Sequence, residues 1–349
     1  MRKRLLLVGN PENIHVGGHL VEAAASLGVE TRLCDSRQAF AAPRWLSLWN
    51  WHMRGQRPSR LRDFGESVAA ACRDFAPDGL LTTGIAPVET RALMAIGEMG
   101  IARLNFLTDD PWNPAHRAPW FMEALPHYDQ VFSPRRSNLG DLMECGCGRA
   151  SYLPFAYAPS QHFPGPPQSG LASDVIFVGG ADRDRRPIIA ALIAAGMRVA
   201  LYGGYWDRFR ETRAFHRGHA DPQTLRQATA AAKIALCLVR RANRDGHVMR
   251  SFEIPAMGAC MLAEDTEEHR EIFGPNGEAV VYFRSIPGMI EKARRLLKRP
   301  GERQRLARAA HARITGGRNT YADRLADMLA RTTDPNEDRH SRTRTLSRV

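Results

Sequence analysis

Short apolar runs alternate along the chain with segments in which apolar residues recur every three or four positions. Runs of the first kind are typical of buried strands, and segments of the second kind are typical of amphipathic helices. Strands are expected at 5–8, 29–34, 79–83, 102–107, 130–132, 174–180, 198–202, 234–239, 260–263 and 279–283. Helices are expected at 17–27, 61–75, 88–99, 137–145, 222–232, 251–257 and 267–273. A further helix is expected after the strand at 174–180 and should end at about residue 195. This alternation predicts parallel sheets with helices on both faces.

The pattern is interrupted once and then restarts. Residues 154–170 contain five prolines, a density that excludes a helix or a central strand and predicts a linker. A length of 349 residues fits two domains of about 150 residues each. We therefore expect an N-terminal Rossmann-like domain at 1–160, a C-terminal one at 161–330, and a disordered basic tail at 331–349. Two doubly wound α/β domains joined in this way are expected to face each other across a cleft.

Residues 43–62 fit neither pattern. They hold Trp45, Trp49, Trp51 and five arginines. We interpret the segment as an irregular amphipathic excursion, and favour a core or lid role over a dedicated ligand-binding one.

Net charge is +12, and most of the excess lies in one stretch. Residues 284–318 hold eleven Lys or Arg against Glu291 and Glu302, a net charge of 11 − 2 = +9. No nucleic-acid-binding motif accompanies the charge, so a nucleic-acid partner is not expected. A solvated basic face is favoured, and contact with an anionic membrane or a phosphorylated acceptor is the alternative.

The length of the apolar runs and the spacing of the cysteines bear on the location of the protein and on its metal content. The first apolar run, Leu5 to Gly9, is shorter than a signal peptide requires, and no run approaches the ~20 residues of a membrane span, so a cytoplasmic protein is expected. The six cysteines are scattered, and Cys145 and Cys147 are too close for a zinc motif. Free thiols and no bound metal are the expectation.

A glycine turn opens the second domain. Gly179 and Gly180 follow an apolar strand and precede the arginine-rich start of a helix. Glycines let the backbone approach a phosphate, helix N-terminal amides bind anions, and arginine adds charge. Arg186 is the first candidate for a diphosphate contact and Arg183 the second. A tight turn with solvated arginines is an equal alternative.

A second segment carries acids eight positions apart. Asp245 is expected in a loop and Glu253 in the first turn of the helix that follows. This spacing could direct one carboxylate to the hydroxyls of a sugar and the other to a ribose, with a diphosphate between them facing Arg250. The alternative is that Glu253 only favours the helix dipole as a first-turn acid.

The second half resembles the CgeB-like, spore-maturation-type glycosyltransferases of GT-B architecture. The resemblance rests on Phe177-Val178-Gly179 with Arg186, Leu201-Tyr202-Gly203 with Trp206, Arg250-Ser251-Phe252-Glu253 and Ala256-Met257-Gly258-Ala259. Weaker similarities include Leu107-Thr108-Asp109-Asp110-Pro111. It implies that the second domain binds a nucleotide sugar through Gly179, Gly180, Arg186, Arg250, Ser251 and Glu253. Asp245 departs from the E-x7-E pattern of retaining enzymes, since an Asp stands where the first Glu would be.

The acceptor is expected on the first domain. Asp109, Asp110 and His19 are the candidate catalytic residues, with His15 also considered, because an inverting enzyme needs a base near the acceptor hydroxyl. Gly17 and Gly18 form the candidate acceptor-side loop. That Asp109 and Asp110 only form an ordinary turn is as strong a hypothesis as a catalytic role for them. For each histidine, a loop residue without a catalytic role is the favoured interpretation. Residues 219–224 are expected to read the nucleobase through backbone groups.

We therefore expect a metal-independent glycosyltransferase that uses a nucleotide-diphosphate sugar as co-substrate and no cofactor. Its acceptor could be a glycan, a lipid-linked glycan or a protein. A sugar-nucleotide epimerase on the same architecture and a non-catalytic binding or regulatory protein are the alternatives.

Overall fold

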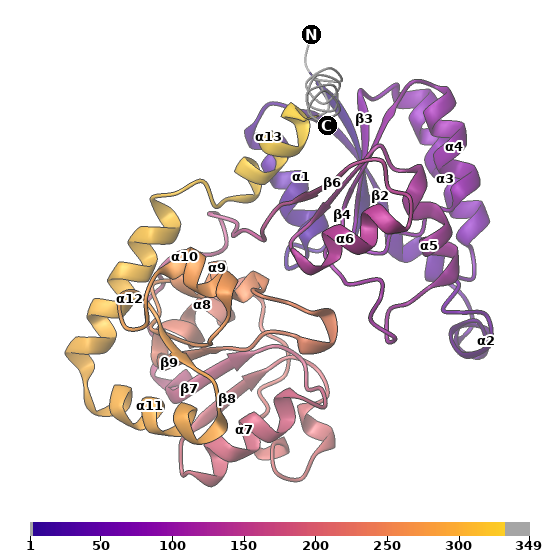
Figure 1. Cartoon of the computed structure of the whole chain (residues 1–349). Helices are drawn as coiled ribbons and strands as arrows, with labels where there is room; N and C mark the ends of the chain where they lie inside the picture. The colour runs from indigo at the N-terminus through magenta and orange to yellow at the C-terminus, as the bar shows by residue number, and fades with distance from the viewer. Residues whose placement is uncertain (1–2, 332–349) are drawn as a thin grey trace, which may run out of the picture. The chain divides into compact units, whose positions relative to one another are not determined.

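A computed structural model describes residues 3–331, and the chain divides into two compact units. The first unit takes in the chain up to Leu153 and again from Tyr321 onward, and the second is Pro154–Thr320. Each unit is built on one parallel sheet with its own apolar core (Figure 1). No helix within the described residues is both long and apolar enough to cross a bilayer.

The sheet of the first unit has six strands in the order β2-β1-β3-β4-β5-β6. The strands are β1 (Arg4–Gly9), β2 (Glu30–Asp35), β3 (Gly79–Thr83), β4 (Ala102–Phe106), β5 (Gln130–Ser133) and β6 (Ala150–Tyr152). The helices are α1 (Val16–Ser26), α2 (Arg44–Met53), α3 (Leu61–Phe75), α4 (Thr90–Glu98), α5 (Pro119–Ala124), α6 (Ser137–Glu144) and α13 (Tyr321–Ala330). Helices α1 and α13 lie on one side of this sheet, and α3 and α4 on the other (Figure 1).

The sheet of the second unit has five strands in the order β11-β10-β9-β7-β8. The strands are β7 (Ser173–Val178), β8 (Val199–Tyr202), β9 (Ala232–Cys237), β10 (Met261–Glu264) and β11 (Val281–Phe283). The helices are α7 (Arg185–Ala194), α8 (Pro222–Ala231), α9 (Met249–Ala256), α10 (Glu267–Phe273), α11 (Ile286–Lys298) and α12 (Pro300–Thr315).

Strand order reverses once in each sheet. From β1 the chain adds β2 on one side and then β3 on the other, and from β7 it adds β8 and then β9 in the same way. Helices that leave the two strands on either side of a reversal diverge onto opposite faces, which opens a crevice at the carboxyl ends of these strands. The crevices expected for ligands therefore lie beyond β1 and β3 in one unit and beyond β7 and β9 in the other.

The prediction of two doubly wound α/β units is confirmed, and each of the ten expected strands is present within a few residues. Central strands such as β1 and β7 are buried on both faces, which makes them continuous apolar runs in the sequence. Strand β6 was missed because its three residues, Ala-Ser-Tyr, carry no such run.

The domain boundaries differ from the expected ones at both ends of the second unit. Helix α13 belongs to the first unit, where Tyr321 stacks on His19 of α1 with ring centroids 4.8 Å apart. Residues 154–170 were expected to be a linker, but they pack into the second unit. Tyr157 bridges Thr320, and His162 is buried. The proposed tail lies outside the described residues, apart from Arg331.

The interpretation of residues 43–62 as irregular was wrong. Residues 44–53 form α2, and its tryptophans are exposed instead of belonging to the core. Its periodic apolar positions were mistaken for an irregular excursion because the helix is short and has no side-chain cap.

Candidate functional site

The glycine turn after β7 is held by its own backbone. The Gly179 N–H donates to the Tyr202 carbonyl at 2.8 Å, and the Gly179 carbonyl accepts from the Trp206 indole at 2.7 Å. Gly203 has a φ of +125°, and a Cβ there would lie 2.6 Å from the Gly179 backbone. Glycine at 203 therefore lets the end of β8 approach this turn, and both polar groups of the Gly179 backbone are used within the fold.

Arg185 lies at the point where the strand order reverses. Its guanidinium is 3.5 Å from the Gly180 carbonyl after β7 and 3.5 Å from the Leu238 carbonyl after β9. The side chain is 7% exposed, and its Nε has no hydrogen-bond partner within the described residues. Asp182 is the nearest carboxylate, 3.5 Å from Nε. A guanidinium has five N–H donors, and the two carbonyls accept from only two of them, so the described residues leave the hydrogen-bonding capacity of Arg185 incompletely used.

A second cation and two acids surround Arg185. Burial lowers the pKa of Arg185, Asp182 and Asp245 oppose this change, and the neighbouring charge of Arg240 adds to it. Arg240 makes no ion pair within residues 3–331. An anion bound here would offset the desolvation of Arg185 and its repulsion by Arg240. Sequence reasoning singled out neither arginine.

Arg250 lies near the same strand end. Burial raises the pKa of the Cys237 thiol to about 12, while the charges of Arg185 and Arg250 act in the opposite direction. Both guanidinium groups are therefore close to the end of β9. Arg250 and Asp245, which the sequence singled out, thus lie with Arg185 around one strand edge.

Arg186 and Arg183, the arginines that the sequence favoured, lie elsewhere on α7 and its entry loop. Arg186 is exposed, donates to Glu211 at 2.5 Å and stacks on Phe209 at 4.3 Å. Arg183 and Arg186 both line a surface hollow with a volume of about 580 Å³. Adjacent helical residues point about 100° apart, so only one of a consecutive pair faces the sheet edge. The structure puts Arg185 in that position.

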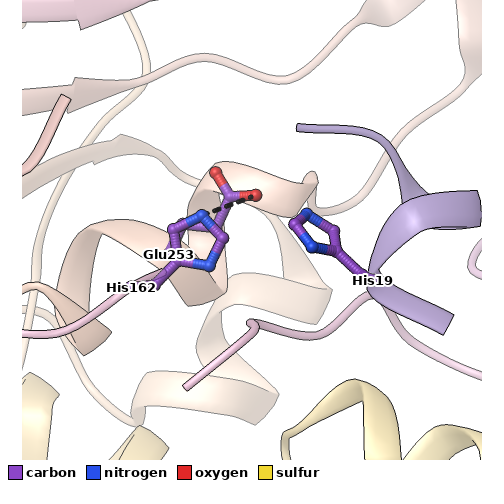
Figure 2. Close-up of side chains that lie close together, drawn as sticks. All are labelled: His19, His162 and Glu253. Carbon is purple, nitrogen blue, oxygen red and sulfur yellow. Dashed lines mark ion pairs between the residues drawn. The ribbon is translucent and has the colours of Figure 1, made fainter. Parts of the chain in front are cut away.

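Glu253 lies in the second turn of α9, because the helix begins two residues earlier than expected. No acid occupies the first turn, so the alternative that Glu253 serves the helix dipole is wrong. The carboxylate is 1% exposed and accepts from Arg250, one turn earlier. Its other partner is His162, with 3.6 Å between Nε2 and Oε1 (Figure 2). His19, also drawn in Figure 2, belongs to the first unit.

Hydrogen bonds define the tautomer of His162. The Ala158 N–H donates to Nδ1 at 3.0 Å, so the ring carries its proton on Nε2, the atom that faces Glu253. A buried carboxylate needs such donors to remain charged. His162 and Arg250 thus hold Glu253 in place, and the remaining carboxylate lone pairs could accept from the hydroxyl groups of a ligand.

Ser251 has a structural role in this conformation. Its hydroxyl accepts from the Val248 N–H at 3.1 Å and lies 2.8 Å from Nε2 of His269. Nδ1 of His269 is 2.8 Å from the Glu264 carbonyl and can only donate to it, so Nε2 accepts from Ser251. Ser251 is fully buried, with these bonds using its donor and one acceptor position. The residue therefore fixes the start of α9 between Arg250 and Glu253.

His269 gives the protein a pH-dependent stability. Burial lowers its pKa from 6.5 to about 4. Between these values the unfolded chain binds more protons, so this contribution is complete above pH 6.5 and is lost as the pH falls toward 4. The loss amounts to about 3 kcal/mol at 1.36 kcal/mol per pKa unit. Urea unfolding from pH 7 to pH 4 should show it in the wild type, and His269→Gln should have a correspondingly flatter profile. Parallel profiles would contradict the assignment.

The loop that carries Asp245 is anchored through His247 to two other segments of the second unit. His247 is buried, accepts from the Phe155 N–H at 3.1 Å and lies 2.5 Å from Glu268 of α10. Residues 219–224, the expected nucleobase contact, end in a helix cap. Asp221 accepts from the Gln223 and Thr224 amides at 2.8 and 2.9 Å, so these two amides are already engaged.

The candidate residues of α1 are packed closely. A Cβ on Gly17 would lie 2.5 Å from the Asn10 carbonyl oxygen, and one on Gly18 would lie 2.4 Å from that of Glu12. Both glycines therefore let α1 begin against the loop that follows β1. His19 is buried on the α13 side of this helix, whereas His15 precedes the helix and pairs with Glu12 at 3.5 Å.

Asp109 and Asp110 differ sharply although they are neighbours. Asp110 is fully buried, and its Oδ1 accepts from the Trp112 N–H at 3.0 Å and the Asn138 amide at 2.9 Å. It holds the turn after β4. Asp109 is half-buried, and Thr108 lies 3.4 Å from its Oδ2. Of the two acids, Asp109 is therefore the one whose side chain is partly exposed.

Residues 183–330 match the family described as glycosyl transferase-like. No curated protein sequence matches the chain significantly. Several solved structures are similar over nearly the whole chain. The Anabaena protein HepE in complex with UDP-glucose has a TM-score of 0.65 at 12% identity, covering 94% of this chain and 99% of HepE.

Two further structures match over similar lengths. The α,α-trehalose 6-phosphate synthase of Burkholderia multivorans has a TM-score of 0.61 at 11% identity, covering 100% of this chain and 99% of that one. The UDP-GlcNAc 2-epimerase of Neisseria meningitidis bound to UDP-GlcNAc has a TM-score of 0.52 at 14% identity, covering 94% and 100%. The chain has the GT-B fold of these proteins, and its second half matches a glycosyltransferase-like family.

Proposed function

We propose that the protein is a glycosyltransferase that takes a sugar from a nucleoside-diphosphate donor bound by the second unit. The observation that carries the proposal is Arg185, a buried arginine with unused donors at the switch point between β7 and β9. A diphosphate is an anion that would use these donors. The family match of residues 183–330 and the UDP-sugars held by similar structures support the same ligand class.

The remaining roles follow from the neighbouring groups. Arg185, Arg240 and Arg250 stabilise the negative charge that develops on the leaving diphosphate, so we propose that transfer needs no metal ion. Glu253, held by His162, accepts hydrogen bonds from the ribose hydroxyls. Asp245, one methylene shorter than glutamate, lies beside the diphosphate arginines and contacts the transferred sugar.

Acceptor activation is assigned to Asp109. We expect Asp109→Asn to lower kcat by about 100-fold or more with donor affinity unchanged, because general-base catalysis contributes at least this much. Asp110→Asn is the matched control, since it keeps the acceptor oxygen of the turn and should retain the rate. Full activity in Asp109→Asn would remove this residue from the mechanism, and a rate loss confined to Asp110→Asn would exchange the two roles.

The first experiment is a thermal-shift series with UDP, GDP, ADP, CMP and their sugar conjugates, with and without EDTA. A ligand at one hundred times its dissociation constant stabilises the folded protein by about 2.7 kcal/mol. A shift with one nucleotide that EDTA leaves unchanged is the expected result. The absence of a shift with all of them would contradict a nucleotide-sugar site.

An epimerase is the second candidate, because the similar structures include a UDP-GlcNAc 2-epimerase. The two activities separate without knowledge of the acceptor. An epimerase converts the free nucleotide sugar into its epimer with no acceptor present. A transferase changes no ring carbon other than the anomeric one, and it releases nucleotide only when it transfers or hydrolyses the sugar.

A further inference from the structure

Helix α2 exposes its apolar side chains and buries a polar one. Trp45, Leu48, Trp49 and Met53 lie at i, i+3, i+4 and i+8, the spacing of an apolar helix face. These side chains are exposed by 71, 50, 55 and 66%. The buried residue of the helix is instead a polar one, Asn50, which donates to Ser59 at 2.9 Å. The face that would ordinarily pack on a core is turned to the solvent.

The segment after α2 fixes this orientation. The Gln56 side chain donates to the Ala115 carbonyl at 3.2 Å, and the Trp120 indole donates to the Gln56 carbonyl at 3.3 Å. Arg57 pairs with Glu89 at 3.2 Å. These contacts anchor residues 56–57 to the rest of the first unit, and α2 projects from that unit (Figure 1).

Positive charge flanks the apolar face. Residues 43–62 contain five arginines and no acid. Arg57, Arg60 and Arg62 each have a carboxylate partner. Arg44 and Arg54, at the two ends of α2, pair with no carboxylate within residues 3–331. The exposed face is thus bordered by uncompensated positive charge.

We propose that α2 is an interfacial anchor that docks the first unit on an anionic lipid bilayer. Ten residues span about 15 Å, which is too short to cross the ~30 Å apolar core of a bilayer. Because the apolar face runs along the length of the helix, α2 would lie in the plane of the membrane surface. Tryptophan favours the boundary between headgroups and acyl chains, and arginine binds anionic headgroups. This inference does not depend on the identity of the sugar donor.

The basic stretch 284–318, for which membrane contact was the alternative to a solvated face, is less suited to it. At least seven of its eleven cations are engaged within the fold. Six form ion pairs or donate to backbone carbonyls, namely Arg284, Arg295, Arg299, Arg303, Arg305 and Arg313, and Arg318 has a partner as well. The stretch also has no large exposed apolar side chain that could enter a bilayer.

The test is sedimentation of the full chain with phosphatidylcholine vesicles that contain 30% phosphatidylglycerol or none. The wild type should bind the anionic vesicles, with a blue shift of its tryptophan emission. Trp45→Ser/Leu48→Ser/Trp49→Ser should lose at least tenfold in partitioning, although the rest of the chain and its charge are unchanged. Arg44→Gln/Arg54→Gln should lose about 30-fold on anionic vesicles, at roughly 1 kcal/mol for each arginine.

The matched control is Leu27→Ser/Met143→Ser, which removes two exposed apolar side chains elsewhere on the same unit and should leave binding unchanged. UDP binding should be the same in all variants, which separates this test from that of the donor site. Equal vesicle binding by the wild type and the triple variant would overturn the proposal. A wild-type dimer that the triple variant converts to a monomer, without vesicle binding, would assign α2 to self-association instead.

Discussion

Replacing Arg185 by methionine is expected to weaken UDP binding by about 10- to 100-fold, the range for hydrogen bonds to a charged group. The reason is its position: it is buried between the ends of β7 and β9 with donors left over for an anion. Methionine fills a similar volume, and Asp182, the carboxylate nearest Arg185, is 36% exposed and so stays solvated when the guanidinium is removed. Isothermal titration of each variant with UDP, or with the nucleotide that the thermal-shift series selects, measures the effect.

The adjacent residue provides the control. Arg186→Met removes the same charge from the same helix, but Arg186 is exposed and paired with Glu211, so affinity should stay within about twofold. Arg185→Lys should recover only part of the affinity, because an ammonium cannot make the two-pronged contact of a guanidinium. A large loss in Arg186→Met with none in Arg185→Met would return the diphosphate site to Arg186.

Glu253→Gln is expected to lower UDP affinity by about 10-fold or more, because a neutral amide replaces the charged acceptor proposed for the ribose hydroxyls. The substitution also leaves Arg250 without its partner carboxylate. A simple affinity loss could therefore come from a displaced Arg250 instead of a lost ribose contact.

Ligands that lack parts of UDP distinguish these causes. The wild type should bind 2′,3′-dideoxy-UDP more weakly than UDP, and Glu253→Gln should bind both alike. Pyrophosphate, which has no ribose, should bind the wild type and Glu253→Gln equally. If Glu253→Gln lowered pyrophosphate affinity as much as UDP affinity, Glu253 would act by positioning Arg250.

Part of the candidate site could be read from the sequence because its residues are close together along the chain. Asp245, Arg250 and Glu253 come from a single loop and helix, and this loop leads from β9 to the helix that precedes β10. In a parallel sheet such a loop always lies at the carboxyl edge. Local sequence thus placed these three residues at one edge, although not their individual contacts.

Other parts of the site depend on residues that are distant in sequence or on a choice between neighbours. His162 reaches Glu253 from a segment whose prolines resemble a linker. Ser251 was a donor-binding candidate from the sequence, yet its hydroxyl is taken up by Val248 and His269. Neither fact has a local signal, because each is decided by which segments pack together.

The sequence by itself determined the two doubly wound sheets, since apolar period and length reflect burial on one or both faces of each element. Only the tertiary structure decided which faces meet. It turned Arg185, and not Arg186, toward the ends of β7 and β9, and it placed α13 in the first unit, where Tyr321 stacks on His19. It also turned the apolar face of α2 outward. Periodicity shows that a helix has an apolar face, but whether that face meets a core or the solvent depends on the surface available around it.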